Sequence, residues 1–218
     1  MLDVAIRKAD GTTSVDLGRR AAPPLPVHRA LGGVLPHGLR RGSTVAVSGS
    51  ISLLLATLGA ASADGAWCAL VGFPPISAEA AVEYGIDLSR LAIIPSPGSG
   101  WTTAVGALLD ALDVVAARPP RLVPGDIRRL AARARTREAV LMPYTDQWPG
   151  ADVRLRAEPG RWDGIGDGSG RLRARRLDVQ AEGRGQAARP RSATLWLPAP
   201  GGGVRVEEPV APVIELAG

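Results

Sequence analysis

Five short apolar runs separated by helical segments limit this chain to one class of fold. The runs consist mainly of Val, Leu, Ile and Ala, and polar residues do not alternate with them. A strand is apolar on both sides when both faces of its sheet are covered, as in parallel sheets with crossover helices. The sequence therefore predicts an α/β fold with a mainly parallel sheet and helices on both faces. The predicted strands are 44–47, 67–72, 91–94, 112–117 and 139–142.

The segments between these runs have helical patterns and recognisable boundary residues. Ser77 is placed to cap the start of one helix, and Gly85 follows its end. Each predicted helix lies between two predicted strands, which is the order that crossover connections require. The predicted helices are 51–63, 77–84, 101–111 and 126–135.

The pattern changes after Pro149, where polar and apolar residues alternate and no helix is predicted. The alternating segments are 151–157, 172–180 and 192–197. Alternation indicates strands with one covered face, so we expect an antiparallel extension at one edge of the sheet. The glycine-rich stretch 164–170 is interpreted as a hairpin loop, because no helix follows it.

Length and composition favour a single domain with tails. The chain has 218 residues, of which 45% are apolar, enough for one buried core. We expect a flexible N-terminal arm over 1–26, the domain over 27–198, and a tail rich in Pro and Gly over 199–218. No signal segment or membrane-spanning apolar run is evident, so a cytoplasmic location is expected.

Three residues that often carry chemistry are interpreted as structural. Cys68 is the single cysteine and lies in an apolar stretch, so we expect it in the core. His28 and His37 have no carboxylate or second histidine at metal-binding spacing. The sequence therefore predicts no metal site.

The turn after the first predicted strand lies where a phosphate-binding loop would lie, but it lacks the required residues. Such a loop uses glycines for close approach of the backbone, a lysine for the phosphates and a Ser or Thr for magnesium. When the pattern begins at Gly49, the second glycine falls on Leu54, the lysine on Leu55 and the Ser or Thr on Ala56. Apolar side chains here would exclude a triphosphate, so no nucleotide cofactor is expected.

The formal net charge of +5 and the pI near 10.5 favour an anionic partner. The same richness in arginine is also typical of a GC-rich genome. Aromatic residues make up only 4% of the chain, so composition does not indicate a base-stacking surface.

A series of phrases in the sequence resembles the RecA-like family. The stretch 29–45, which contains LGGVLPHGLRRGSTV, is similar to the lead-in to the phosphate loop of that family. The phrases at 68–71, 84–91 and 95–97 then follow in the RecA-like order, and the resemblance covers about 27–197. It implies a RecA-like domain.

The departures from the RecA-like pattern imply that this chain is not an enzyme. The acidic residue that follows the second core strand in RecA-like enzymes is replaced here by the segment 72–75. The aspartate linked to magnesium is replaced near Arg118, and a positive side chain cannot hold a cation. In place of the DNA-binding loop of RecA, this chain has only the segment 144–150. We therefore expect the chain to lack all three parts of a phosphoryl-transfer site, which are substrate positioning, metal binding and water activation.

Size and the degenerate loop make the chain similar to the ImuA/SulA-like branch of the RecA-like family. That resemblance implies a role in DNA-damage-induced translesion synthesis within a mutasome, in the SOS response, near the nucleoid or replication fork. The implied partner is an ImuB-type inactive Y-family polymerase homologue, with an error-prone C-family DNA polymerase and the sliding clamp as indirect partners. Two alternatives stay open: a SulA-like cell-division inhibitor and an arginine-rich DNA-binding module.

Candidate surfaces for a protein partner or DNA come from three features. They are the basic helix near 128–137, tryptophans in loops rich in Pro and Gly, and alternating residues of the C-terminal third, which could place a strand along a partner. Each has a structural alternative: a solvated helix face, tryptophans that pack on the edge hairpin, and a tail that covers its own edge strand. The candidate residues are Arg128, Arg129, Arg133, Trp148, Trp162, Arg173, Arg175, Val204, Val206 and Val210.

Overall fold

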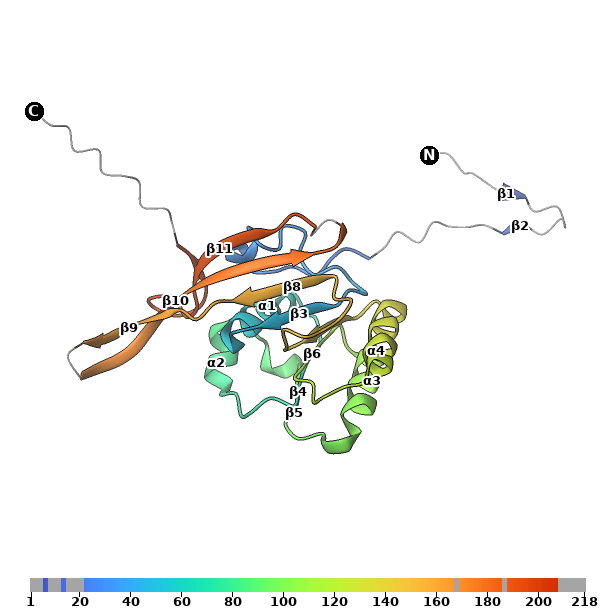
Figure 1. Ribbon diagram of the computed structural model, residues 1–218, viewed down its shortest axis with the longest axis horizontal. Helices are drawn as coiled ribbons and strands as arrows, with labels where there is room; N and C mark the ends of the chain where they lie inside the picture. Colours follow the sequence, from blue (N-terminus) through green and yellow to red (C-terminus); the bar gives the residue numbers. More distant parts are fainter. Residues whose placement is uncertain (1–5, 8–12, 15–21, 167–168, 186–187, 208–218) are drawn as a thin grey trace, which may run out of the picture.

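A single layer of strands forms the centre of the molecule in the computed structural model, which describes residues 6–7, 13–14, 22–166, 169–185 and 188–207 (Figure 1). Parallel strands form one half, in the order β5 (Leu91–Ile94), β4 (Cys68–Val71), β6 (Val114–Ala117) and β7 (Val140–Pro143). The other half has the order β3 (Val45–Ser48), β8 (Val153–Ala157), β10 (Ser169–Gly183), β11 (Arg191–Trp196) and β12 (Arg205–Val206). Parallel bridges from Thr44 to Leu141 and from Val47 to Tyr144 join β3 to β7, so the halves are continuous.

Helices cover both faces of the parallel half. The first core cluster lies under α1 (Ile51–Ala63) and α2 (Ala78–Glu83), and the second lies under α3 (Trp101–Ala111) and α4 (Pro124–Arg137). Short 3-10 helices are η1 (Arg29–Leu31), η2 (Leu88–Arg90) and η3 (Gly98–Gly100), and β1 (Ile6–Arg7) pairs antiparallel with β2 (Thr13–Ser14).

Successive residues of the parallel strands enter opposite core clusters. Val45 and Val47 lie in the first cluster, whereas Ala46 lies in the second. In β4, Leu70 lies in the first cluster and Val71 in the second. This burial on both sides explains the continuous apolar runs and confirms the predicted α/β fold class.

The last parallel strand is β8, and this corrects the expectation that the whole region after Pro149 is antiparallel. β8 pairs parallel with β3 and antiparallel with β10. Its side chains alternate because Leu155 and Ala157 enter the first core cluster, while Arg156 is exposed on the face that lacks a helix. Alternation indicates that only one face of a strand is covered. It does not indicate whether the strand is parallel or antiparallel to its neighbour.

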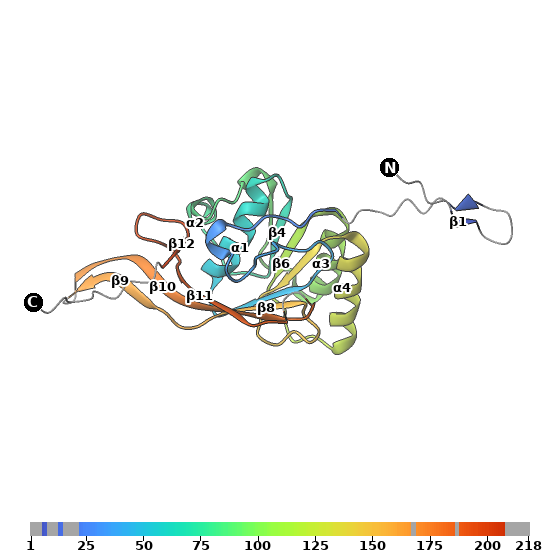
Figure 2. The ribbon, with the colours of Figure 1, turned by 90° about the horizontal axis from the view of Figure 1, so that it is seen from above.

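A long hairpin projects from the sheet (Figures 1 and 2). It is formed by β9 (Arg161–Gly166) and the first part of β10, which pair antiparallel. The predicted hairpin is therefore present, but the stretch 164–170 is not only a loop, because strand residues of β9 and β10 enter it. Sequence reasoning did not predict β9.

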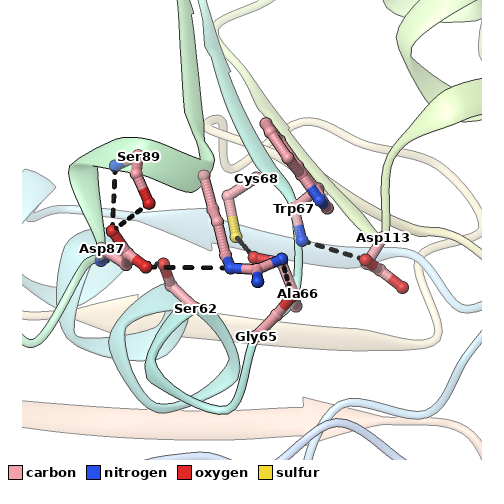
Figure 3. A network of polar contacts seen from close by, with 9 residues as sticks. Ser62, Gly65, Ala66, Trp67, Cys68, Asp87, Ser89 and Asp113 are labelled. Atoms are coloured by element: carbon pink, nitrogen blue, oxygen red, sulfur yellow. Dashed lines mark hydrogen bonds and ion pairs between the residues drawn. The ribbon is translucent and has the colours of Figure 1, made fainter.

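A polar network stabilises the edge where the parallel strands begin (Figure 3). Asp113, just before β6, accepts a hydrogen bond of 2.9 Å from the backbone N–H of Trp67. Asp87 caps η2 by accepting bonds from the backbone N–H and the hydroxyl of Ser89, at 2.9 and 2.7 Å. The phrase 84–91, one basis of the RecA-like resemblance, therefore has a structural role here.

The buried core extends slightly beyond the predicted domain bounds of 27 and 198. Leu25 is buried and exchanges two backbone hydrogen bonds of 2.9 Å with Leu39. Ala199 is also buried, and its N–H donates to the carbonyl of Gly203. Both ends of the domain are thus fixed by local backbone pairing.

Within the described ranges, no helix has the length and apolar character needed to cross a membrane.

Candidate functional site

The connection between β3 and α1 is a tight two-residue turn. β3 ends at Ser48 and α1 begins at Ile51. The N–H of Leu53 donates to the Ser50 hydroxyl at 3.3 Å, so the helix caps itself with its own residue. A phosphate-binding loop needs a longer run of backbone N–H groups aimed at the ligand, and this turn does not provide it.

Gly49 in this turn lies against the end of β8. Its φ is +84°, and a Cβ atom there would lie only 1.9 Å from the carbonyl oxygen of Ala157. The backbone of β8 thus occupies one side of the turn.

The residues at the phosphate-loop positions belong to the core. Leu54 and Ala56 are fully buried and Leu55 is 3% exposed, and all three lie in the first core cluster. Their side chains point into the protein interior instead of to a ligand. The structure therefore places them as packing residues of α1.

Aromatic and positive side chains follow the ends of β4, β6 and β7. Phe73, which follows β4, is buried, and its ring centroid lies 5.7 Å from that of Tyr144. Partial burial raises the pKa of the Tyr144 hydroxyl, and the nearby guanidinium groups of Arg118 and Arg175 oppose this effect. Arg118 is exposed at the end of β6, where the metal-linked carboxylate would lie. No cluster of His, Cys, Asp or Glu suited to a metal ion occurs in the part of the chain that the structure describes.

The predicted basic helix is α4, but its arginines are partly engaged within the domain. Arg129 forms an ion pair of 2.9 Å with Asp126. Arg133 makes two hydrogen bonds to Asp110 of α3. Arg128 is exposed and has no carboxylate partner among the described residues. Two of the three candidate arginines therefore have structural contacts that compete with binding.

Trp148 is not a surface residue, which corrects its predicted place at an interface. It is 1% exposed and lies in the second core cluster, between the sheet and helices α3 and α4. The carbonyl of Trp148 accepts a hydrogen bond of 3.0 Å from Arg154. The adjacent Pro149 and Gly150 place the backbone in a loop, but the indole folds under it and contributes to the core.

Trp162 and Arg175 are brought together on the projecting hairpin. They are direct partners in the register of β9 and β10, and the Arg175 guanidinium carbon lies 5.5 Å from the centroid of the Trp162 ring. Trp162 is 41% exposed. Arg173 lies two residues further along β10 and is exposed. Sequence reasoning missed the exposed Arg161, Arg171 and Leu172 of the same hairpin, although arginines flanking a glycine-rich turn were a visible signal.

The C-terminal candidates lie at the opposite edge of the sheet from β5. Val204 is partly buried against the first core cluster, and Val206 is 40% exposed in β12. Glu207 forms an ion pair of 2.8 Å with Arg176 and donates its backbone N–H to Thr194. The candidate Val210 lies outside the described residues.

Comparisons of the sequence with known proteins identify relatives. A family model described as the MT3502 N-terminal domain matches residues 33–150. The uncharacterised protein Rv3395c of Mycobacterium tuberculosis (strain ATCC 25618 / H37Rv) is 35% identical over 158 residues, which are 68% of this chain and 78% of that protein.

Comparisons of the fold identify RecA-like neighbours. The flagellar accessory protein FlaH from Methanocaldococcus jannaschii has a TM-score of 0.59 at 15% identity, over 86% of this chain and 99% of FlaH. The RadB recombinase has a TM-score of 0.57 at 15% identity, over 77% of this chain and 92% of RadB. These similarities confirm the RecA-like fold. SulA from Pseudomonas aeruginosa has a TM-score of only 0.40 at 17% identity, over 46% of this chain and 96% of SulA.

Proposed function

The chain belongs to the family described as the MT3502 N-terminal domain, and we propose that it is a non-catalytic RecA-like adaptor that acts by binding another protein. The observation that carries this proposal is the two-residue turn after β3, followed by the core residues Leu54, Leu55 and Ala56. In this RecA-like domain, side chains of the chain itself occupy the positions of the phosphate-loop residues. The scaffold and its surfaces are still present. Its work is then recognition rather than turnover.

The residues around the turn support the same proposal. Arg118 stands where a carboxylate would hold magnesium, and two positive charges near Tyr144 oppose the approach of a cation. Phosphoryl transfer depends on positioning and on electrostatic stabilisation by a metal, and neither has the residues it needs at this edge.

Calorimetry with ATP, ADP and magnesium tests the non-catalytic part. We expect no heat of binding at the turn, because Leu54, Leu55 and Ala56 leave neither a lysine nor glycine clearance. A micromolar, magnesium-dependent nucleotide site would contradict the proposal. If the Gly49→Ala variant still folds but no longer binds the nucleotide, the nucleotide site lies at the turn.

The finer part of the proposal names the partner. The sequence resembles the ImuA/SulA-like branch, so the partner is an ImuB-type inactive Y-family polymerase homologue. The chain would help to place that homologue at a damaged replication fork during translesion synthesis, with the C-family polymerase and the sliding clamp as indirect partners. The fold shared with the RadB recombinase supports a setting in DNA repair.

Co-purification with a tagged chain after DNA damage tests the partner. Retention of the ImuB-type homologue at stoichiometric amounts supports the adaptor. Retention of a tubulin-like division polymer in its place would favour the SulA-like alternative. Retention of neither, with a folded chain, would contradict the proposed partner and leave the nucleotide test unaffected.

A further inference from the structure

The hairpin of β9 and β10 carries arginines that are not neutralised by carboxylates. Among the residues that the structure describes, its members without an ion pair are Arg161, Arg171, Arg173 and Arg175. Arg176 at the base differs, because it pairs with Glu207 at 2.8 Å. The arm also carries the exposed carboxylate of Asp163, which forms no ion pair among the described residues, so the arginines leave an excess of positive charge on it.

Apolar groups are exposed on the same arm. Trp162 is 41% exposed and Leu172 is 47% exposed. Arg175 lies over the Trp162 ring at 5.5 Å, so the indole is held in place by a cation on the opposite strand. A fixed, exposed indole beside arginines is a platform on which a flat aromatic group can stack.

Arginines repeat along the β10 strand of the hairpin. Arg171 and Arg173 precede Arg175 at intervals of two residues, and the register of β9 and β10 shifts between Gly170 and Ala174. The result is a row of arginines on β10 with the Trp162 ring beside Arg175.

We propose that the hairpin arm of β9 and β10 binds single-stranded nucleic acid. The arginines neutralise successive phosphates and release counterions, and the exposed face of Trp162 stacks on an unpaired base. A duplex keeps its bases stacked inside and offers no such face to the indole. The site is separate from the connection 144–150, whose Trp148 is buried.

Fluorescence anisotropy with a labelled single-stranded oligothymidine of about 20 nucleotides tests the proposal on the full chain. We expect binding at about 50 mM salt that weakens steeply at higher salt. The double variant Arg171→Ala/Arg173→Ala lowers the slope of log K against log salt by about 1.4, because each lost phosphate contact removes about 0.7 for a single strand. Trp162→Ala weakens binding about tenfold and leaves that slope unchanged.

The matched control is Arg29→Ala/Arg135→Ala, in η1 and α4. It removes the same charge from two exposed arginines that form no ion pair among the described residues. We expect it to bind the oligonucleotide within about twofold of the parent chain. Equal losses in both double variants would overturn the proposal, because binding would follow net charge. Absence of binding at about 50 mM salt, or unchanged affinity in Trp162→Ala, would also overturn it. Circular dichroism and Tm confirm that each variant folds.

Discussion

A single residue, Gly49, is fixed by backbone packing in the turn between β3 and α1. The glycine keeps a positive φ, as expected of a turn between a strand and a helix, but the space beside it belongs to the carbonyl of Ala157. The close approach of β8 requires glycine here for a reason unrelated to phosphate. A glycine retained at this position is therefore no sign of nucleotide binding.

We predict that Gly49→Ala destabilises the domain more than the same change at Gly65. Both residues have positive φ, but a Cβ at Gly49 meets backbone at 1.9 Å, whereas a Cβ at Gly65 meets nothing within 4 Å. The free energy of unfolding should fall by about 2–4 kcal/mol for Gly49→Ala and by about 1–2 kcal/mol for Gly65→Ala. Urea denaturation measures both, and equal losses would show that the contact with Ala157 is not tight.

Cys68 provides a second prediction at this scale. Burial raises the pKa of its thiol to about 12, with a further contribution from the Asp113 carboxylate. The folded pKa lies above the ordinary value of 9.0, so the thiol stabilises the fold below pH 9 and this stability is lost as pH rises toward 12. In denaturation curves above pH 9, we expect the parent chain to lose stability more steeply than Cys68→Ala. Parallel losses in the two chains would contradict the assignment. Thiol reagents should modify the native chain only as it unfolds.

Helices α3 and α4 share apolar packing in the second core cluster and are also linked by one carboxylate. Asp110 of α3 accepts hydrogen bonds from Arg133 and, at 3.0 Å, from Arg137 of α4. The Arg133 hydrogen bond is the main cause that lowers the pKa of Asp110 to about 2. The basic face of α4 thus acts in part as an inter-helix contact.

We predict that Asp110→Asn lowers Tm at neutral pH and that the difference from the parent chain disappears in acid. The folded pKa is lowered, so the contribution is present above the ordinary value of 3.8 and is lost as pH falls toward about 2. Thermal melts at several pH values measure the difference, and Asp126→Asn, which removes a pair within α4, is the matched control. A difference that stays constant from neutral to acid pH would show that the ion pair does not stabilise the helix contact.

Most elements of the parallel half could be predicted because their causes are local. Ser77 caps α2 by accepting a bond of 3.1 Å from Ala80, as its position before an apolar segment indicated. The direction of β8 could not be predicted, since Leu155 and Arg156 alternate in the same way beside a parallel or an antiparallel neighbour. The burial of Trp148 depends on contacts far along the chain, and no local pattern reports them. The pairing of Trp162 with Arg175 depends on hairpin register, which a glycine-rich turn leaves open.

At the scale of the whole molecule, the two halves of the sheet differ in how they are covered. Helices pack on both faces of β4, β6 and β7, whereas β8, β10 and β11 have one face without a helix. A polar groove of about 410 Å³ lies on that face, lined in part by Ser48, Arg156, Gln180 and Ser192. Partner recognition by a RecA-like scaffold therefore has more available surface in the C-terminal half of the chain.

A C-terminal segment that binds a partner and one that only covers its own sheet respond differently to truncation. Residues 201–207 are fixed by the Arg176–Glu207 ion pair, by a bond of 3.1 Å from the Gly203 N–H to Glu83, and by packing of Val204 on the core. Deleting 201–218 should therefore lower the free energy of unfolding by about 1–3 kcal/mol, whatever the partner does. Deleting only 208–218 keeps all of these contacts.

We predict that the 208–218 deletion abolishes retention of the ImuB-type partner and leaves Tm unchanged, because the truncated chain keeps every contact named for 201–207. Thermal melting and co-purification are measured on both truncations, and the parent chain is the reference. If the shorter truncation retains the partner fully, the partner surface lies elsewhere, and the groove beside Arg156 and Gln180 is the next surface to mutate. A fall in Tm of the shorter truncation would instead show that residues 208–218 stabilise the domain itself.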